Sequence, residues 1–292
     1  MDIGLALPQM TTGLDRPTML QWCQAIDSGP FSSISAGERI TFHNLDGFTL
    51  CSAAAVLTER VRVLLNVAVL PWHAPAMAAQ ELASIDVLSN GRLEVAVGVG
   101  GRADDYSALG SAFTKRFQRL DDGVAQLRHY WNGGTAADGK SVGPTPIHPG
   151  GPPILASAMG PKSLARAAKW ADGISGFSLT ADAEEMHRAN AAAGQAWMDA
   201  GRSTKPKLLS GSFFALGPDA PETLQSFGYR YLEVFSPDLA DALSRSLPLH
   251  NDEALRNALV AARDAGCDEF ILVPADASVE QVTRVSEVVQ SL

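Results

Sequence analysis

The sequence predicts an α/β protein of the (β/α)8 type, a TIM barrel. Short apolar runs of strand length alternate along the chain with segments of helical periodicity, a pattern typical of parallel βαβ units. Eight such units fit a chain of 292 residues, because a barrel of this kind takes about 250 residues. We expect a single domain over residues 1–292, with the excess length in two insertions, at about 133–153 and 218–249.

The expected strands are bounded by turn residues, and the third is almost continuously apolar, as in a parallel strand covered on both faces. They occupy Ile3–Pro8, Ser32–Ala36, Val61–Leu70, Leu93–Gly98, Ile154–Ser157, Gly173–Phe177, Lys207–Leu216 and Glu269–Val273. The expected helices occupy Arg16–Asp27, Asp46–Thr58, Pro75–Ser89, Thr114–Trp131, Pro161–Trp170, Ala181–Ala200, Asp252–Ala265 and Ser278–Gln290.

The residues at three of the expected helix ends explain why the helix begins or ends there. Pro161 opens a helix where its missing N–H costs nothing, Ser278 can cap the last helix, and Gly266 follows a helix end. The insertion at 133–153 is dense in Gly and Pro, whereas 218–249 has helical patches but weak periodicity. Long connections in barrels often form lids or substrate walls, so we expect both insertions to carry specificity.

Charge and cysteine usage exclude several classes. The chain has 23 basic and 32 acidic residues, for a net charge of −9, which gives no basic field for nucleic acid. Three widely spaced cysteines fit reduced thiols better than a disulfide framework. The start shows no signal-peptide pattern and no stretch reads as a membrane span, so we expect a cytoplasmic protein with no membrane partner.

The run Gly98-Val99-Gly100-Gly101-Arg102-Ala103 matches the dinucleotide pattern G-x-G-x-x-G/A. Three βα units precede it, however, and two aspartates follow it where a pyrophosphate would dock, so the match is weak. Tight strand-to-loop geometry alone would also explain the glycines. We prefer a third interpretation, in which Gly98, Gly100 and Gly101 let the backbone approach a planar ligand at the carboxyl end of the barrel.

Two other strand ends carry polar side chains. Glu38, Arg39 and His43 follow the second strand and are candidates for acid/base chemistry and for holding an anion, although a solvated loop would look the same. Trp72 and His73 follow the third strand between two prolines, and they are either pocket walls or ordinary rim packing.

A turn of small residues leads into the helix expected to begin at Pro161. Ser157, Ala158, Met159 and Gly160 precede its first residue, so free N–H groups there suit a phosphate, although such turns also occur merely for close packing. No histidine has metal-ligand spacing, so we expect no metal. Hydrolase and nucleotide-triphosphatase motifs are missing from the sequence.

As a set, these residues resemble the bacterial luciferase-like superfamily of flavin and deazaflavin oxidoreductases. The resemblance covers nearly the whole chain in order. It rests on the segments 71–75, 81–93, 98–100, 116–121, 171–173 and 265–274. It implies a luciferase-like TIM barrel that binds coenzyme F420 or, alternatively, FMN at the carboxyl end of the strands.

The resemblance also implies roles for particular positions. A bulge on the third strand, often with a non-proline cis peptide, would support the cofactor ring near Val67–Ala68, with Asn66 beside it. Backbone at Gly98–Gly101 would flank the ring, and Ser157–Gly160 would hold the phosphate. Arg102 would reach that phosphate or the acidic tail of F420. Many deazaflavin members have an acidic residue followed by His after the second strand, whereas this chain has Glu38 followed by Arg39.

We therefore expect an enzyme that transfers a hydride between F420 or FMN and a small organic substrate. Glu38, Arg39 and His43 would face that substrate, and His43 would serve as acid or base. Two alternatives stay open: an FMN-dependent monooxygenase that uses O2, and a non-catalytic ligand-binding barrel. The family resemblance adds the expectation of a homodimer.

Overall fold

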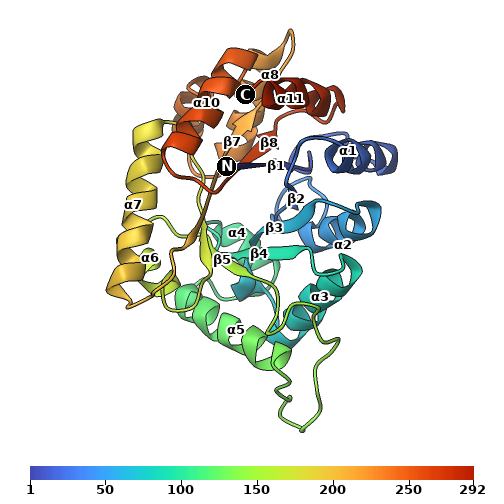
Figure 1. The fold of residues 1–292 in the computed structure, drawn as a ribbon, viewed down its shortest axis with the longest axis vertical. Helices are drawn as coiled ribbons and strands as arrows, with labels where there is room; N and C mark the ends of the chain where they lie inside the picture. Colours follow the sequence, from blue (N-terminus) through green and yellow to red (C-terminus); the bar gives the residue numbers. More distant parts are fainter.

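The computed structural model describes residues 1–292, and its eight strands form a closed barrel in which each strand pairs in parallel with the next and β8 pairs with β1 (Figure 1). The predicted barrel is thus confirmed. The strands are β1 (Asp2–Ala6), β2 (Ser33–Ala36), β3 (Arg62–Ala68), β4 (Leu93–Val97), β5 (Ile154–Ala156), β6 (Gly173–Ser175), β7 (Lys207–Phe214) and β8 (Glu269–Pro274).

The helices surround the barrel and cover the outer face of the strands (Figure 1). They are α1 (Arg16–Ser28), α2 (Gly47–Leu57), α3 (Pro75–Leu88), α4 (Ala103–Ala108), α5 (Arg116–Trp131), α6 (Pro161–Ala167), α7 (Ala183–Asp199), α8 (Ala220–Leu232), α9 (Pro237–Arg245), α10 (Asp252–Asp264) and α11 (Glu280–Gln290). A short 3-10 turn, η1 (Leu70–Trp72), follows β3. None of the helices is long and apolar enough to cross a membrane.

Charged side chains fill the interior at the amino ends of the strands. Arg62 on β3 pairs with Glu269 on β8 at 2.8 Å and with Glu94 on β4 at 2.9 Å, and Lys207 on β7 contacts Glu94 at 2.8 Å. Glu269 is fully buried and also accepts hydrogen bonds from two serine hydroxyls. Above this network, a layer of apolar side chains closes the interior: Ala6, Leu64, Ala96, Leu155, Leu209 and Ile271.

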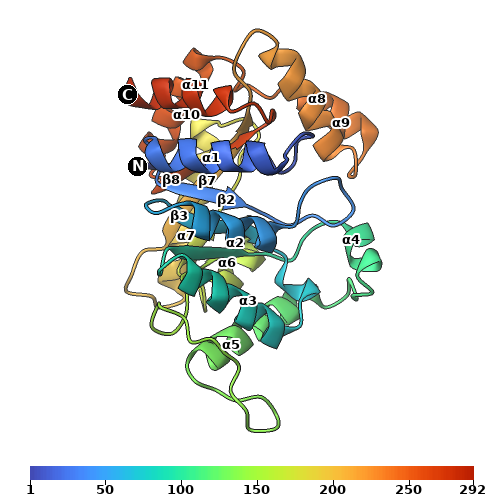
Figure 2. The same ribbon diagram turned by 90° about the vertical axis from the view of Figure 1, so that its right-hand side faces the viewer.

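The segment 218–249, expected to be an irregular insertion, is mostly helical. It forms α8 and α9, which pack closely on one another. A backbone hydrogen bond from Ala215 to Leu249 closes its base. Both helices are short, with 13 and 9 residues, and only four residues separate them, so no long helical period runs through the segment. Figure 2 places α8 and α9 at the carboxyl end of the strands, and the unpredicted short α4 at the same end.

The other insertion lies at the opposite end of the barrel, which corrects the expectation that it carries specificity. Residues 133–153 connect α5 to β5, and such a helix-to-strand connection falls at the amino ends of the strands. His148 is anchored there, since its Nδ1 lies 2.7 Å from the buried carboxylate of Asp86 on α3. This segment therefore packs on the outer helices and does not reach the carboxyl end.

Candidate active site

The carboxyl end of β3 is irregular in the way the resemblance implied. The pairing register with β4 shifts between Asn66 and Ala68, and the peptide bond between Asn66 and Val67 is cis. The cis bond thus lies one residue before the expected position, Val67–Ala68. Asn66 and Val67 are half-buried, whereas Ala68 is fully buried and belongs to the core.

The loop after β2 packs directly against this bulge. A Cβ atom on Gly37 would lie 2.3 Å from the carbonyl oxygen of Asn66, so only glycine allows the two chains to approach so closely. The backbone N–H of Glu38 then donates to the carbonyl of Val67 at 3.1 Å. The ends of β2 and β3 are therefore locked together at the carboxyl end of the barrel.

The Glu38 carboxylate completes this contact. It accepts a hydrogen bond from the Val69 backbone N–H at 2.6 Å and lies 2.9 Å from Nε2 of His73, and the Glu38 side chain is only 3% exposed. Burial lowers the pKa of His73, but the hydrogen bond and charge of Glu38 outweigh this effect and raise it above its ordinary value. Two predicted site residues thus form one pair behind the β3 bulge, where they position backbone.

Asn66 is held from the other side of the barrel. Its Oδ1 accepts a hydrogen bond of 2.8 Å from the hydroxyl of Ser175 on β6. Because β3 and β6 are not neighbours in the sheet, this bond crosses the barrel interior. Nothing in the local sequence singles out Ser175, and only the closure of the barrel brings it to Asn66.

A surface with little side-chain bulk lies beside the bulge. A Cβ atom on Gly98 would lie 3.1 Å from Cγ1 of Val67 and 3.2 Å from Cβ of Ser157, so the ends of β3, β4 and β5 meet at this glycine. Gly100 has φ +62° and lies against Val69 and the Trp72 ring. The three strand ends named in the sequence prediction therefore come together.

The rest of this rim is less uniform. The Trp72 ring meets Tyr106 of α4 edge to face, with centroids 5.8 Å apart, and its indole N–H has no hydrogen-bond partner. Gly101 is exposed, and a Cβ atom added there would lie 3.7 Å from the Phe235 ring. In the predicted phosphate turn, Ala158 is buried, whereas Ser157, Gly160 and especially Met159, at 81% exposure, are open.

Arg39 lies under the α8 segment, apart from the Glu38–His73 pair. Its guanidinium stacks on the Phe42 ring at 3.6 Å and lies 5.2 Å from the Tyr231 ring, and the residue is 6% exposed. Arg102 approaches the same Tyr231 ring at 5.2 Å. Neither arginine forms an ion pair with a carboxylate.

His43 does not join Glu38. Its ring is exposed, stacks on Phe42 with centroids 4.0 Å apart, and its Nε2 lies 3.2 Å from the carbonyl of Met10. The loop after β2 turns outward between Arg39 and His43. The closeness of these two residues in the sequence gave no sign of this turn.

Gln9, after β1, is a rim residue that the sequence analysis missed. Its side-chain amide donates to the Gly37 carbonyl at 2.6 Å and accepts from the Gly37 N–H at 2.7 Å. A polar residue directly after the first strand was the available signal. The ends of β1, β2 and β3 are therefore connected by hydrogen bonds.

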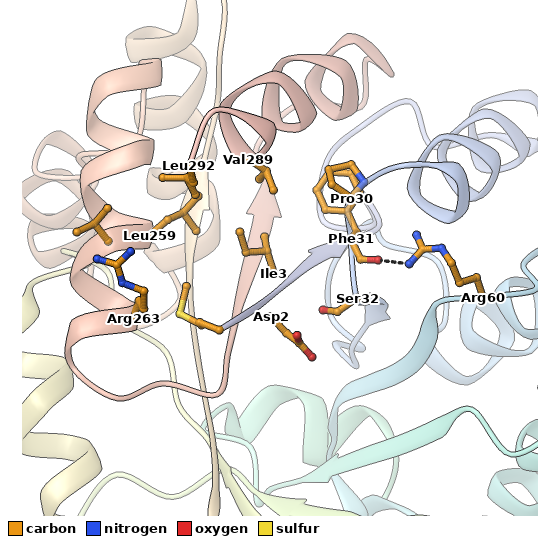
Figure 3. A pocket seen from close by; sticks show the side chains of 12 residues that line it. Asp2, Ile3, Pro30, Phe31, Ser32, Arg60, Leu259, Arg263, Val289 and Leu292 are labelled. Atoms are coloured by element: carbon orange, nitrogen blue, oxygen red, sulfur yellow. Dashed lines mark hydrogen bonds between the residues drawn. The ribbon is translucent and has the colours of Figure 1, made fainter.

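A separate hollow of about 460 Å³ lies at the amino end of the barrel (Figure 3). It is lined by β1, the start of β2, and side chains of α10 and α11 such as Leu259 and Val289. Because polar groups from several strands converge at the carboxyl end instead, we assign the candidate active site to that end.

The residues at the carboxyl end fit a planar cofactor. Gly98 allows the ends of β3, β4 and β5 to pack tightly together, and the half-buried bulge at Val67 belongs to the same junction. The unpaired indole N–H of Trp72 and the unpaired Nε of Arg102 add donors near this rim. A flat ring system with an anionic substituent suits this combination of closely packed strand ends, aromatic side chains and cationic groups.

The chain belongs to the luciferase-like monooxygenase family, whose sequence model matches residues 5–290. It is therefore an enzyme of the group that comprises flavin- and F420-dependent monooxygenases and oxidoreductases. The resemblance inferred from the sequence motifs is confirmed.

Among curated relatives, the pyrimidine monooxygenase RutA of Yersinia enterocolitica is 30% identical over 143 residues, which are 44% of this chain and 38% of that protein. The oxygenase component of a flavin-dependent trigonelline monooxygenase from Acinetobacter baylyi is 27% identical over 161 residues, 50% of this chain and 44% of that protein. The matched part thus spans less than half the length of these relatives.

Solved structures share the fold over the full chain. The monooxygenase RslO1 from Streptomyces bottropensis superimposes with a TM-score of 0.77 at 21% identity, covering 100% of this chain and 98% of that one. An F420-dependent secondary alcohol dehydrogenase in complex with an F420-acetone adduct gives 0.78 at 17% identity, covering 100% and 99%. At these identities the likeness describes the fold.

Proposed function

We propose that the protein is an FMN-dependent monooxygenase that acts on a small organic substrate at the carboxyl end of its single barrel domain. The observation that carries the proposal is the close approach of three strand ends at Val67, Gly98 and Ser157, beside the irregular, half-buried end of β3. The curated relatives described above are named as monooxygenases, which favours oxygenation over other flavin chemistry.

Bound reduced FMN would supply two electrons, so that one oxygen atom of O2 enters the substrate and the other leaves as water. Val67 would support one face of the ring, and Gly98 would allow Val67 and Ser157 to approach each other closely enough to form this support. Glu38 and His73 would keep this support in place from behind. The turn Ser157–Gly160 would contact the phosphate, as the resemblance implies.

Aromatic side chains from the segment after β6, from β7 and from α8 would exclude water from this site. Phe213 at the end of β7 contacts Phe177, with centroids 4.7 Å apart, and also the Phe227 and Tyr231 rings of α8. Such a wall suits an oxidation in which water competes with the substrate.

Hydride transfer between F420 and the substrate is the second candidate, and one observation favours FMN over it. Oxidation of an alcohol or reduction of a carbonyl needs a proton acceptor or donor beside the reacting carbon. In this chain Glu38 is occupied by Val69 and His73, and His43 contacts the Met10 carbonyl. Arg39, which stays protonated at neutral pH, stands where the acid-base group is expected.

Difference spectra with FMN, reduced FMN and F420 at matched concentrations test this proposal. We expect binding of FMN in at least one redox state at micromolar concentrations, and O2 consumption coupled to substrate oxidation when a reductase supplies reduced FMN. Tighter binding of F420 than of FMN would replace the proposal with the second candidate. Failure of both cofactors to bind at about 50 µM would favour a ligand-binding barrel without catalysis.

A homodimer through α2 and α3 is also proposed. These two helices pack side by side and keep five large apolar side chains exposed, which is more than scattered surface residues need. They are Val56, Leu57, Met77, Val87 and Leu88, with exposures of 39–58%. A second copy of the chain would cover this surface.

A further inference from the structure

Two arginines at the carboxyl end of the barrel lie near the same aromatic ring, and neither forms an ion pair. Arg39 follows β2 and Arg102 follows β4, and both guanidinium groups approach the ring of Tyr231 at 5.2 Å. No carboxylate oxygen lies within 4.0 Å of either group, although ion pairs of that kind hold other arginines of the chain, such as Arg62. This part of the rim therefore carries two positive charges that no ion pair holds.

The burial of Arg39 makes the missing partner more significant. The residue is 6% exposed, its Nε has no hydrogen-bond partner, and its only hydrogen bond is a long one of 3.5 Å to the Tyr231 carbonyl. Burial, with a smaller contribution from Arg102, lowers the pKa of Arg39 to about 10, so the group is still charged at neutral pH. A buried cation without a partner is costly, and a bound anion would remove this cost.

The nearest carboxylates reduce this cost but form no ion pair with Arg39. Asp105 of α4 uses one oxygen to accept hydrogen bonds from the backbone N–H and hydroxyl of Thr41, and it forms no ion pair with Arg39. Glu233, just after α8, also forms no ion pair with it. The charges of Asp105 and Glu233 both raise the pKa of Arg39, but burial outweighs them. The arginine pair thus has donors free for a ligand.

The walls around the pair are aromatic. Phe42 stacks on Arg39, Phe235 lies 5.6 Å from Arg102, and the Tyr231 ring lies 5.2 Å from each guanidinium group. Rings and guanidinium groups together suit a flat ligand that carries a carboxylate, because the cations bind the carboxylate while the rings contact its apolar part.

We propose that Arg39 and Arg102 form a subsite for the carboxylate of an aromatic or similarly flat substrate. This inference rests on the proposed function, which makes the carboxyl end of the barrel the substrate site, and it names the substrate class. The same anion chemistry exists in the phosphate of FMN and in the acidic tail of F420. The contacts of Arg39 favour the substrate, since they come from the β2 loop, the β4 loop and the α8 segment and not from the turn at Ser157–Gly160.

Benzoate and benzamide are the probes, because they share a ring and nearly the same shape but differ in charge. Calorimetric titration of the full chain without cofactor should give benzoate an affinity at least about tenfold higher than benzamide, the size expected for charge-assisted hydrogen bonds. In Arg39→Gln and in Arg102→Gln this ratio should fall close to one. Arg39→Lys, which keeps the charge but not the fork of donors, should retain part of the preference.

Arg245→Gln is the matched control, because Arg245 is an exposed arginine of α9 that pairs with Asp241. It should keep the full benzoate preference, and thermal melting should show that each variant is folded. Equal affinity of the two probes in the natural protein, or failure to bind either, would overturn the proposal. So would an unchanged benzoate preference in Arg39→Gln.

A second arm separates the substrate from the cofactor. FMN and riboflavin differ by the phosphate, so their affinity ratio reports on whatever group holds that phosphate. We expect Arg39→Gln to leave this ratio unchanged, and a fall in the ratio of about tenfold would mean that the arginines hold the cofactor instead. F420 with its acidic tail removed serves the same purpose. If no cofactor binds at all, the proposed function fails, while the benzoate comparison still decides about the subsite.

Discussion

The Glu38 carboxylate accepts a hydrogen bond of 2.6 Å from the backbone N–H of Val69, which joins the end of β2 to the irregular end of β3. His73 lies 2.9 Å from the same carboxylate. Glu38 therefore acts on the candidate site through the backbone that it holds.

The substitution Glu38→Ala should loosen this end of β3. The buried Val69 N–H and the His73 ring would both lose their acceptor, so we expect a loss of about 1–3 kcal/mol in the free energy of unfolding. FMN affinity should fall as well, because the bulge at Val67 would lose its support. Urea unfolding and flavin titration measure the two effects. Glu287→Ala, on the exposed face of α11, should change neither, and a Glu38→Ala variant as stable as the natural protein would contradict the assigned role.

The stability of the protein should depend on pH through His73. Its pKa in the folded state is raised above the ordinary value of 6.5, so its contribution is fully present below about pH 6.5 and is lost as pH rises through the folded pKa. The stability difference between the natural protein and His73→Gln should therefore shrink between pH 6 and 9, a range chosen around that value. Urea unfolding at several pH values measures it. His187→Gln, at an exposed position of α7, should show no such trend, and a difference for His73→Gln that is constant with pH would refute the pairing.

A methyl group at Gly98 should weaken cofactor binding. The added Cβ would lie 3.1 Å from Val67 and 3.2 Å from Ser157, so these two side chains, assigned to the ring support and the phosphate turn, would have to move apart. We expect Gly98→Ala to lower FMN affinity by about tenfold or more, measured by flavin titration. Gly194→Ala is the matched control, because a Cβ there meets no atom within 4 Å and the residue lies in α7. It should leave binding unchanged and be neutral or stabilising by up to about 1 kcal/mol. Equal FMN affinity in both variants would place the ring elsewhere.

The network at the amino end should govern stability without affecting binding. Glu269→Gln would leave Arg62 and Lys207 partly unpaired in a buried site, at a cost of about 3–5 kcal/mol. Burial raises the pKa of Glu269, but Arg62, Ser33 and the other partners outweigh it and lower the pKa below 4.5. Its stabilising contribution is therefore present above about pH 4.5 and is lost as pH falls through the folded pKa. Urea unfolding from pH 3 to 7, compared with Glu287→Gln, measures this difference. A variant within about 1 kcal/mol of the natural protein would disprove it.

The apolar surface on α2 and α3 predicts the oligomeric state. We expect light scattering to give the mass of a dimer for the natural protein and of a monomer for the double variant Val56→Glu/Val87→Glu, because charges at a buried interface are costly. Met198→Glu adds a charge at an equally exposed apolar residue of α7 and should leave the dimer intact. A natural protein that is monomeric at micromolar concentration would rule out this interface.

The barrel was predictable from sequence because its signal is repeated along the whole chain. Each strand, from Ile3 to Val273, is a short apolar run, and each run is followed by a helical segment, so that small errors at one boundary do not change the fold class. The helices α8 and α9 were missed as regular elements because they are short, with 13 and 9 residues, and lie only four residues apart.

The candidate site was predictable only in part. Glycine patterns indicated that Gly98 lies at a strand end with little side-chain bulk, since small residues report directly on close approach. Tertiary contacts carry no such local signal. The partner of Asn66 is Ser175, 109 residues further along the chain. Tyr231 reaches Arg39 from an insertion whose place over the barrel could not be predicted from the sequence.

The insertion that holds Tyr231 has consequences for how such a protein can diversify. Its base is closed by the Ala215–Leu249 hydrogen bond, and α10 restarts with its own cap, because the Asn251 side chain accepts from the Ala254 N–H at 2.9 Å. The segment that contains α8 and α9 is therefore a separate insertion. Its length and sequence can change in evolution or by design while the barrel and its cofactor surface are retained. New substrate preferences can then arise without any new fold being needed.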